Sequence, residues 1–247
     1  MKSNFSIHIW TSDKNMVCLP ATCYLFNKFW PTRENVKILG YQHPNHELPE
    51  NFEFISLGKQ RGPRYWSNDM QNFYSNEECD FFYSIWEDAF ILKKVDERIL
   101  NLVNVLIEKD KNFFKFNLTA DVSTRKHIGL KSFEEFELIV ADQYSRYRFS
   151  TQHCVWNKKL FLEKLSPNQT PWDFELSDKK AYNDGLNIYG TKNNYAVYMG
   201  HLYKSGKKRS NWYDCVYGKN GNKTHTVEGL NTDDVSYIEE KGWVPSI

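Results

Sequence analysis

Short apolar runs, separated by turn residues and by amphipathic segments, make up the first 110 residues of this chain. Short apolar or alternating runs predict strands, and apolar residues at three- to four-residue spacing predict helices. The pattern predicts strands at 5–10, 36–41, 52–57 and 81–86, and helices at 15–30, 66–76 and 96–109. Strands that alternate with helices in this way indicate βαβ units and a mostly parallel sheet.

The rest of the chain has a less regular pattern. Ser132 and Glu135 have the spacing of a capping box, which predicts a helix that continues to about Gln143. Three further elements are expected: extended chain at 147–153, a helix at 156–165 and a late strand at 195–203. Since the sequence shows neither an internal repeat nor a low-complexity linker, one domain over residues 1–247 is expected.

Two adjacent carboxylates, Glu87 and Asp88, interrupt an apolar run that begins at Phe81. Removing an ionised acid from water costs several kcal/mol unless it is paired or bound to a metal. Ligands of α/β sheets bind at the carboxyl ends of strands, where this pair lies. The pair therefore predicts a divalent-cation site that holds a phosphate-bearing ligand. The alternative is an acid pair that caps the next helix or forms a salt bridge with Lys93 or Lys94.

Composition excludes several classes of protein. The net charge is +1, so no overall field recruits nucleic acid or an anionic membrane. No apolar run reaches the roughly 18–20 residues that crossing a bilayer needs, and the N-terminus does not resemble a signal peptide. Five widely spaced cysteines without a CxxC motif indicate reduced thiols in a cytoplasmic protein, not a zinc site or disulfides. Aromatic residues make up 16% of the chain, which suits a stacking cleft or an aromatic core.

The order of several short motifs resembles that of GT-A-type glycosyltransferases, in particular small soluble bacterial and viral nucleotide-sugar transferases. The pieces cover roughly residues 5–176: Thr11-Ser12-Asp13, Tyr41, Gly58, Trp66-Ser67-Asn68-Asp69, Glu87-Asp88-Ala89-Phe90, Val95-Asp96, residues 150–157, Ser166-Pro167 and Pro171-Trp172-Asp173-Phe174-Glu175. The last 70 residues match poorly. In that family the acidic motif is usually two aspartates, often as D-x-D, and Glu87 departs from this pattern.

The resemblance implies an α/β, GT-A-like fold with a mostly parallel sheet flanked by helices and a smaller mixed α+β C-terminal acceptor region. Residues of about 1–110 would bind the nucleotide-sugar donor, and residues of about 111–247 the acceptor. The implied activity moves a sugar from a nucleotide-diphosphate sugar, such as a UDP-sugar, to a hydroxyl of a glycan or other acceptor. Mn²⁺ or Mg²⁺ would assist, because hard cations choose carboxylate and phosphate oxygens.

The resemblance also suggests roles for individual residues. Asp88 would hold the metal, Glu87 would act behind it or on the ribose, and His201 would be a late metal ligand; a solvated hairpin is the alternative for the segment around His201. The donor-binding candidates are Thr11, Asp13, Tyr41, Trp66 and Asp69. The alternatives are a helix cap for Asp13 and ordinary packing for Tyr41. Arg61 or Arg64, in the loop before Trp66, could contact phosphate, and the alternative for them is a surface position without a specific role.

Asp173 and Glu175 are candidates for the catalytic base. If their segment is extended, both side chains project to one face, opposite Trp172 and Phe174. An acid beside an aromatic wall has a raised pKa and can accept a proton from an acceptor hydroxyl. The alternative is a helix N-terminus, where acidic residues are routinely favoured.

Two other activities fit the same residues. One is a non-catalytic nucleotide- or carbohydrate-binding module on this fold, with Glu87 as the sign of a degraded metal site. The other is a nucleotidyltransferase, which also uses strand-end acids and a metal. The segment from Thr11 to Asn15 contains no glycine, which argues against the phosphate-binding loop of that class.

Overall fold

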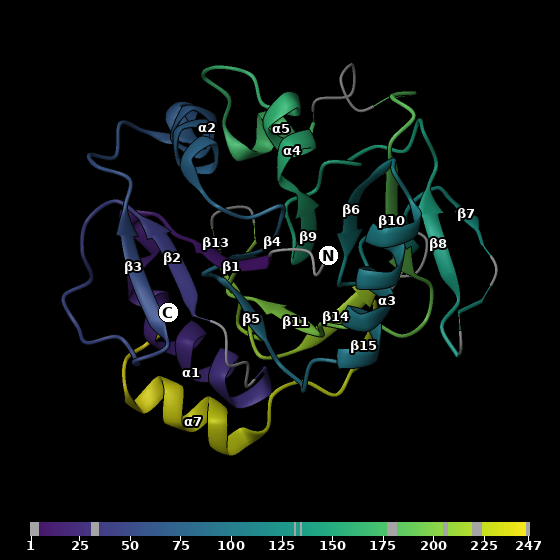
Figure 1. The fold of residues 1–247 in the computed structure, drawn as a ribbon. Coiled ribbons are helices and arrows are strands. Elements are labelled where there is room, and N and C mark those ends of the chain that lie inside the picture. Colours follow the sequence, from purple (N-terminus) through teal and green to yellow (C-terminus); the bar gives the residue numbers. More distant parts are fainter. Residues whose placement is uncertain are drawn as a thin grey trace.

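The computed structural model describes residues 5–30, 35–130, 132–133, 135–176, 182–204, 207–218 and 224–245. A nine-stranded sheet in the order β3-β2-β1-β4-β9-β6-β10-β8-β7 runs through the molecule (Figure 1). Its strands are β1 (Phe5–Trp10), β2 (Val36–Gly40), β3 (Phe52–Ser56), β4 (Phe81–Trp86), β6 (Phe113–Asn117), β7 (His127–Gly129), β8 (Leu138–Ala141), β9 (Cys154–Asn157) and β10 (Asn187–Thr191).

Three two-stranded ribbons lie outside this sheet. They are β5 (Ala89–Ile91) with β11 (Met199–His201), β12 (Tyr203–Lys204) with β13 (Lys207–Lys208), and β14 (Cys215–Gly218) with β15 (Thr224–Val227). The helices are η1 (Asp13–Cys18), α1 (Leu19–Phe29), η2 (Pro63–Tyr65), α2 (Trp66–Asn76), α3 (Glu97–Lys109), η3 (Val122–Thr124), α4 (Lys158–Lys164), α5 (Pro171–Glu175) and α7 (Thr232–Glu240), where η marks a 3₁₀-helix.

The large sheet is mixed. Strands β3, β2, β1 and β4 are parallel, as the βαβ pattern predicts. Strand β9 then runs antiparallel to both of its neighbours, β4 and β6, and β8 runs antiparallel to β10 and β7. The chain proceeds outward from β1 to β3 and then crosses back to β4 on the other side of β1, so the strand order reverses between β1 and β4.

Helices cover both faces of the sheet and bury a separate core on each. On one face α1 and α3 contribute Leu19, Phe26, Ile99 and Leu102. On the other, α2, α4 and α5 contribute Trp66, Tyr74, Phe161 and Phe174, and these three helices lie together at the top of Figure 1. A third apolar cluster lies below α1, where α7 packs over the ribbons. All five cysteines are buried and unpaired, as their spacing predicts.

The four strands predicted in the first 110 residues match β1 to β4 to within a residue, whereas β5 and β6 were not predicted. The helix expected from Ser132 to Gln143 is wrong, because residues 138–141 form the strand β8. Glu134, within the expected capping box, lies outside the described residues. The extended chain expected at 147–153 is also wrong, because Ser150 N donates to Tyr147 O in a turn. The helix expected at 156–165 begins only after β9, and the late strand is shorter than 195–203. Within the described ranges, no helix has the length and apolar character needed to cross a membrane.

Candidate functional site

Strands β1 and β4 end side by side at the carboxyl edge of the sheet. Trp10 is paired with Trp86 in parallel register, and Glu87 N donates to Trp10 O at 3.2 Å. The chain therefore leaves the sheet at Thr11 and at Glu87 next to the point where the strand order reverses. In open α/β sheets, ligands bind in the crevice at such a point.

Glu87 is almost completely buried, with 1% of its surface exposed. Thr22 Oγ1 donates to Glu87 O at 2.6 Å, and the side chain of Asn15 hydrogen-bonds to the carboxyl. The oxygen Oε2 is buried without a hydrogen-bond partner. Burial first, and the adjacent charge of Asp88 second, raise the pKa of Glu87 well above its usual range.

Asp88 is only half-buried, and desolvation raises its pKa to about 6. It is therefore the member of the pair that carries charge at neutral pH. Its carbonyl oxygen accepts from Leu202 N at 2.8 Å, which ties the acids to the segment that links β11 and β12. Lys93 forms its ion pair with Glu228, at 3.7 Å, and no described ion pair joins Lys93 or Lys94 to the acids.

A cavity of about 470 Å³ opens at the ends of β1 and β2. Its lining comprises Asp13, Met16, Val17, Pro20, Gln42, His43, Asn45, His46, Gly242 and Trp243. This volume lies within the range of small-molecule sites. Helix η1 provides Asp13, Met16 and Val17 to the cavity, while its Asn15 reaches Glu87. One 3₁₀-helix thus separates the cavity from the acid pair.

Asp13 joins three loops at this edge. Its Oδ1 accepts from Gln42 N at 3.0 Å, and Asp13 N donates to Gln60 Oε1 at 3.2 Å. The helix cap that was the alternative role for Asp13 is not formed by its side chain. Thr11 is buried instead of lining the cavity, and a Cβ atom at Gly40 would lie only 2.7 Å from its methyl group.

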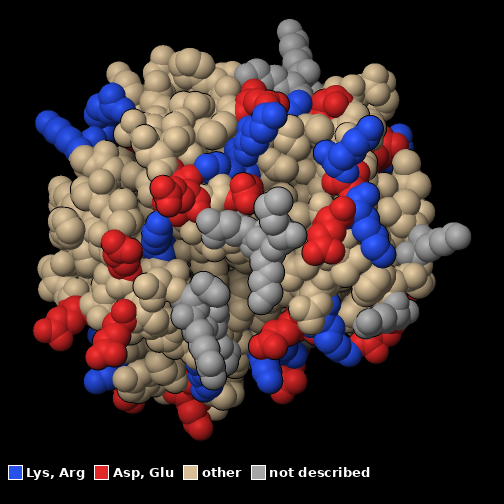
Figure 2. Space-filling model, in the orientation of Figure 1, with Lys and Arg blue, Asp and Glu red and all other residues tan. Residues whose placement is uncertain are grey.

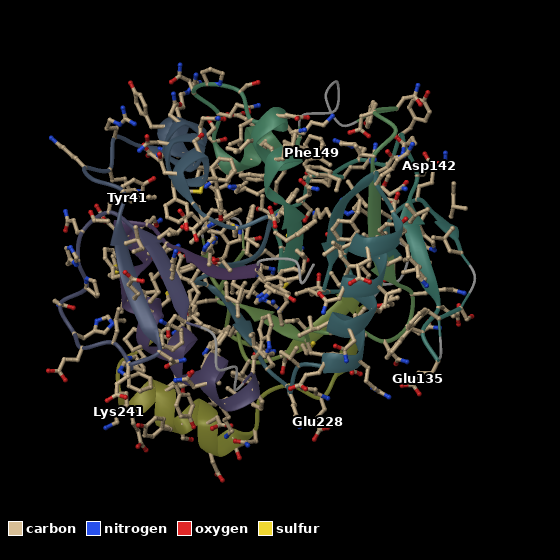
Figure 3. The ribbon with its side chains drawn as sticks, viewed as in Figure 1. Tyr41, Glu135, Asp142, Phe149, Glu228 and Lys241 are labelled. Carbon is tan, nitrogen blue, oxygen red and sulfur yellow. The ribbon has the colours of Figure 1, made fainter. Side chains whose placement is uncertain are left out.

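Tyr41 and two residues of α2, Asp69 and Trp66, lie outside the cavity lining. Tyr41 is beside the ends of β2 and β3, below α2 (Figure 3), and its hydroxyl donates to Asp69 Oδ2 at 3.1 Å. Arg61 pairs with the other oxygen of Asp69 at 2.7 Å. Trp66 packs against Trp10 at 5.7 Å between ring centroids. The three candidates shape the edge, and none of them lines the cavity.

The two candidate bases are in the helix α5, so the extended geometry that would place both side chains on one face is not formed. Thr170 Oγ1 accepts from Asp173 N and Asp173 Oδ2 accepts from Thr170 N, each at 3.0 Å. This reciprocal capping holds the pKa of Asp173 below its usual range. The helix N-terminus, which was the alternative, is the role that the structure shows for Asp173.

Glu175, by contrast, is linked through Thr151 to the last residue of β4. Its Oε1 accepts from Thr151 N at 2.6 Å and from Thr151 Oγ1 at 2.7 Å. Thr151 Oγ1 in turn accepts from Trp86 Nε1 at 3.0 Å. Through Thr151, Glu175 is connected to the residue that directly precedes Glu87.

A buried histidine, His153, and a half-buried one, His201, flank Ala89, which follows the acids. His201 pairs with Ala89 across the β5–β11 ribbon, and His153 Nε2 lies 2.7 Å from Ala89 O. Burial lowers the pKa of each histidine to about 4, so both are neutral at pH 7. No hydrogen bond or ion pair between described residues connects His201 with Asp88. His153 has a buried Nδ1 without a partner, and the sequence pattern left its role open.

A basic hollow of about 460 Å³ lies beyond the acids. Lys204, Lys207, Lys208, Arg209, Ser210 and Asn211 line it. Arg209 N donates to Leu202 O, and Leu202 N donates to Asp88 O, so this cationic ribbon is fixed to the acid pair. The turn residues Ser205 and Gly206 of the expected hairpin lie outside the described residues.

The described residues include no group of three or more His, Cys, Asp or Glu side chains arranged to hold a metal. Mg²⁺ and Mn²⁺ are commonly held by one or two carboxylates together with substrate phosphates and water. Asp88, charged and partly accessible beside the unpaired Oε2 of Glu87, fits this second arrangement.

Comparisons with known proteins identify no family. No protein-family model matches the chain, and no curated protein matches it. Among solved structures, CMP:2-keto-3-deoxy-manno-octonic acid synthetase complexed with CTP matches with a TM-score of 0.42 and 10% identity, over 76% of this chain and 89% of that chain. The chain is an α/β protein with a large mixed sheet flanked by helices, and its acid pair and cavity lie at one edge of that sheet.

Proposed function

We propose that this protein is a glycosyltransferase that moves a sugar from a nucleotide-diphosphate sugar to a hydroxyl-bearing acceptor. The observation that carries the proposal is the arrangement around η1. A cavity of nucleoside size lies on one side of this helix and two strand-end acids lie on the other, where the strand order reverses. The parallel strands β3, β2, β1 and β4 support the GT-A-like fold that the motifs imply.

In this proposal the cavity binds the nucleoside. The aromatic rings of Trp243, His43 and His46 offer faces and edges to a base. Asp13 accepts hydrogen bonds from the ribose hydroxyls. Thr11, Tyr41, Trp66 and Asp69 support the cavity wall from behind instead of contacting the ligand.

Asp88 would hold a Mn²⁺ or Mg²⁺ ion together with the diphosphate, and Glu87 would donate a hydrogen bond to the ligand from its protonated form, which burial favours by raising its pKa. The bound ion would neutralise charge that develops on the leaving diphosphate. His201 remains a proposed further ligand. The basic hollow at Lys204 and Arg209 attracts the same anion from the other side.

Glu175 is the proposed base. It accepts the proton of the acceptor hydroxyl while that oxygen bonds to the anomeric carbon and the bond to the diphosphate oxygen breaks. The two hydrogen bonds from Thr151 fix Oε1, and Thr151 also accepts from Trp86 Nε1, so the carboxylate is oriented at the end of β4. Asp173 cannot share this role while its carboxylate caps α5.

The test combines binding with turnover. We expect UDP, GDP or CMP to raise the melting temperature of the wild-type protein, with a larger shift in Mn²⁺, and the matching nucleotide-sugar to be hydrolysed slowly without acceptor. Asp88→Asn should reduce this turnover about 100-fold or more. Asp80→Asn is the matched control, because Asp80 is exposed at the opposite end of β4.

Each other outcome has a distinct meaning. If no nucleotide or nucleotide-sugar shifts the melting temperature with Mn²⁺ present, the proposal is wrong. Nucleotide binding without turnover indicates the non-catalytic module. Formation of a nucleotide-sugar from a nucleoside triphosphate and a sugar indicates the nucleotidyltransferase.

A further inference from the structure

The exposed face of α2 carries no charge. Its exposed residues are Gln71, Asn72, Ser75 and Asn76, and Asn68 beside them is half-buried. Asparagine and serine are poor helix formers, whereas solvated helix faces usually carry lysine and glutamate. The exposed residues of α3 and α7 follow the usual pattern and include Glu97, Arg98, Glu108, Lys109, Asp233, Glu239 and Glu240. The sequence of α2 therefore departs from what helix stability and solubility favour.

Two hollows lie along this face and meet at one residue. The first, of about 400 Å³, lies between α2 and the loop after α4, and its lining comprises Ser67, Asn68, Gln71, Asn72, Ser75, Leu165, Ser166 and Pro167. The second, of about 330 Å³, lies on the β3 side of α2, and its lining comprises Ile55, Ser56, Leu57, Asn72, Phe73, Asn76 and Glu77. Asn72 lines both hollows, and the two together are called the groove.

The lining is neutral and rich in hydrogen-bonding groups. In the first hollow every polar side chain is an amide or a hydroxyl, and Glu77 is the only titratable residue that lines either hollow. Glu77 is already engaged by Lys37, at 2.7 Å. In Figure 2 the surface over α2, at the upper left, is largely uncharged.

The amide of Asn72 is available to a ligand. Within the part of the chain that the structure describes, its side chain makes no hydrogen bond, although its backbone carbonyl oxygen accepts from Asn76 Nδ2 at 2.8 Å. Gln71 makes one long contact, 3.4 Å from its Nε2 to Ser75 Oγ. By contrast, Asn68 Oδ1 and Ser67 Oγ hold the loop at Asn168 and Gln169 and so form the rigid wall of the groove.

We propose that this groove binds a neutral oligosaccharide. An amide offers a donor and an acceptor in one plane, which matches the adjacent hydroxyls of a sugar ring, and apolar Leu57 and Phe73 suit its C–H face. A phosphate or a nucleic acid would find no cation among the lining residues. The site lies apart from the strand-end acids and binds glycan whether or not the protein transfers sugar.

The experiment measures binding of neutral hexasaccharides of glucose, galactose, mannose and N-acetylglucosamine by calorimetry and saturation-transfer NMR. We expect at least one to bind the wild type and to bind the double variant Gln71→Ala, Asn72→Ala about tenfold or more weakly. Alanine is the better helix former, so α2 remains folded in this variant. Asn104→Ala, the same change at an exposed position of α3, should bind like the wild type.

The proposal is overturned if no neutral hexasaccharide binds at about 5 mM, or if the double variant binds as well as the wild type. It is also overturned if Asp88→Asn removes glycan binding and the α2 variant does not, because the glycan then occupies the strand-end site. The UDP- or GDP-induced melting shift should be unchanged in the α2 variant. If the protein binds glycan but no nucleotide, the proposed transferase activity is wrong, whereas the proposal that the groove binds glycan stands.

Discussion

Glu87 and Asp88 are adjacent in sequence, yet their surroundings give them different chemistry. Glu87 lies against Thr22 and Asn15 inside the protein, and Asp88 reaches the surface beside Leu202. The difference in burial, not the residue type, raises the pKa of Glu87 well above its usual range and that of Asp88 only to about 6. Burial of Glu87 with an unpaired Oε2 lowers the stability of the fold. Such a loss is typical of residues that are retained for their chemistry.

Glu87→Gln should therefore stabilise the fold at neutral pH. The folded pKa of Glu87 lies above its unfolded value of 4.5, so its favourable contribution is complete below pH 4.5 and is lost as pH rises through the folded pKa. We expect the variant to be about 1–3 kcal/mol more stable than wild type at pH 7 and about equally stable near pH 4. Urea denaturation at both pH values measures this. Equal stability at pH 7 would contradict the assignment of Glu87 as a buried neutral acid.

Lys115 is a second buried ionisable group, and it stabilises a turn beside the candidate site. No part of it is exposed, and its ammonium donates to Ser150 O and lies 4.6 Å from the ring centroid of Trp156. It thereby fixes the turn that leads into Thr151, which orients Glu175. Burial lowers the pKa of Lys115 below 10.5.

Lys115→Met keeps the size of the side chain and removes its proton equilibrium. Between the lowered folded pKa and 10.5, the unfolded wild-type chain holds more protons than the folded chain, so wild-type stability rises with pH in that window. We expect the melting temperature of the wild type, relative to Lys115→Met, to increase from pH 7 to pH 10. A constant difference would show that Lys115 is not desolvated.

At the level of elements, the first four strands could be predicted because each is a buried or alternating run that carries its own signal. β8 could not, since the Ser132–Glu135 spacing favours a local helix while pairing with β10 and β7 determines the outcome. The β-branched Ile139 and Val140 were the available signal for a strand. The role of Asp173 was also open to prediction from local sequence. Its position three residues after Thr170 is the spacing of a helix cap, whereas its spacing from Glu175 suggested a pair of catalytic acids.

The ribbon that carries His201 depends on a close approach of two backbones. A Cβ atom at Gly200 would lie 2.3 Å from Trp212 O and 2.8 Å from a methyl of Leu92. Gly200→Ala should destabilise the protein by about 1–3 kcal/mol, because the backbone at Trp212 cannot move aside cheaply. Gly129→Ala on β7 is the control, since nothing lies within 4 Å of the added methyl. Denaturant midpoints compare the two, and a similar small loss in both would contradict this packing.

At the level of the whole molecule, the cavity combines residues from distant parts of the chain. Asp13 and His43 belong to the first sheet loops, and Trp243 follows α7. Such a cavity could not be predicted from local motifs, because the sequence does not show that α7 packs on α1. The contact depends on Asp234, which accepts from Tyr24 Oη at 2.6 Å and forms an ion pair with Lys28.

Asp234→Asn should weaken nucleotide binding although it touches no ligand. Loss of the ion pair loosens α7 on α1 and with it the wall at Trp243, which we expect to cost about 1 kcal/mol, or roughly fivefold in Kd. Titration calorimetry with the nucleotide that binds best measures this. Asp233→Asn, an exposed neighbour on α7, should leave the Kd unchanged.

The position of β9 has a consequence for synthesis of the protein. Strand β4 has no partner on one edge until β9 pairs with it, and β9 is translated about 70 residues after β4. At ribosomal speeds this interval is roughly 4–14 seconds. During it the sequence Phe81-Phe82-Tyr83-Ser84-Ile85-Trp86 is an open, aromatic edge of the kind that nascent chains aggregate through. A chaperone that covers this edge on the ribosome would therefore raise the soluble yield, and the yield of the full-length protein would increase when translation is fast.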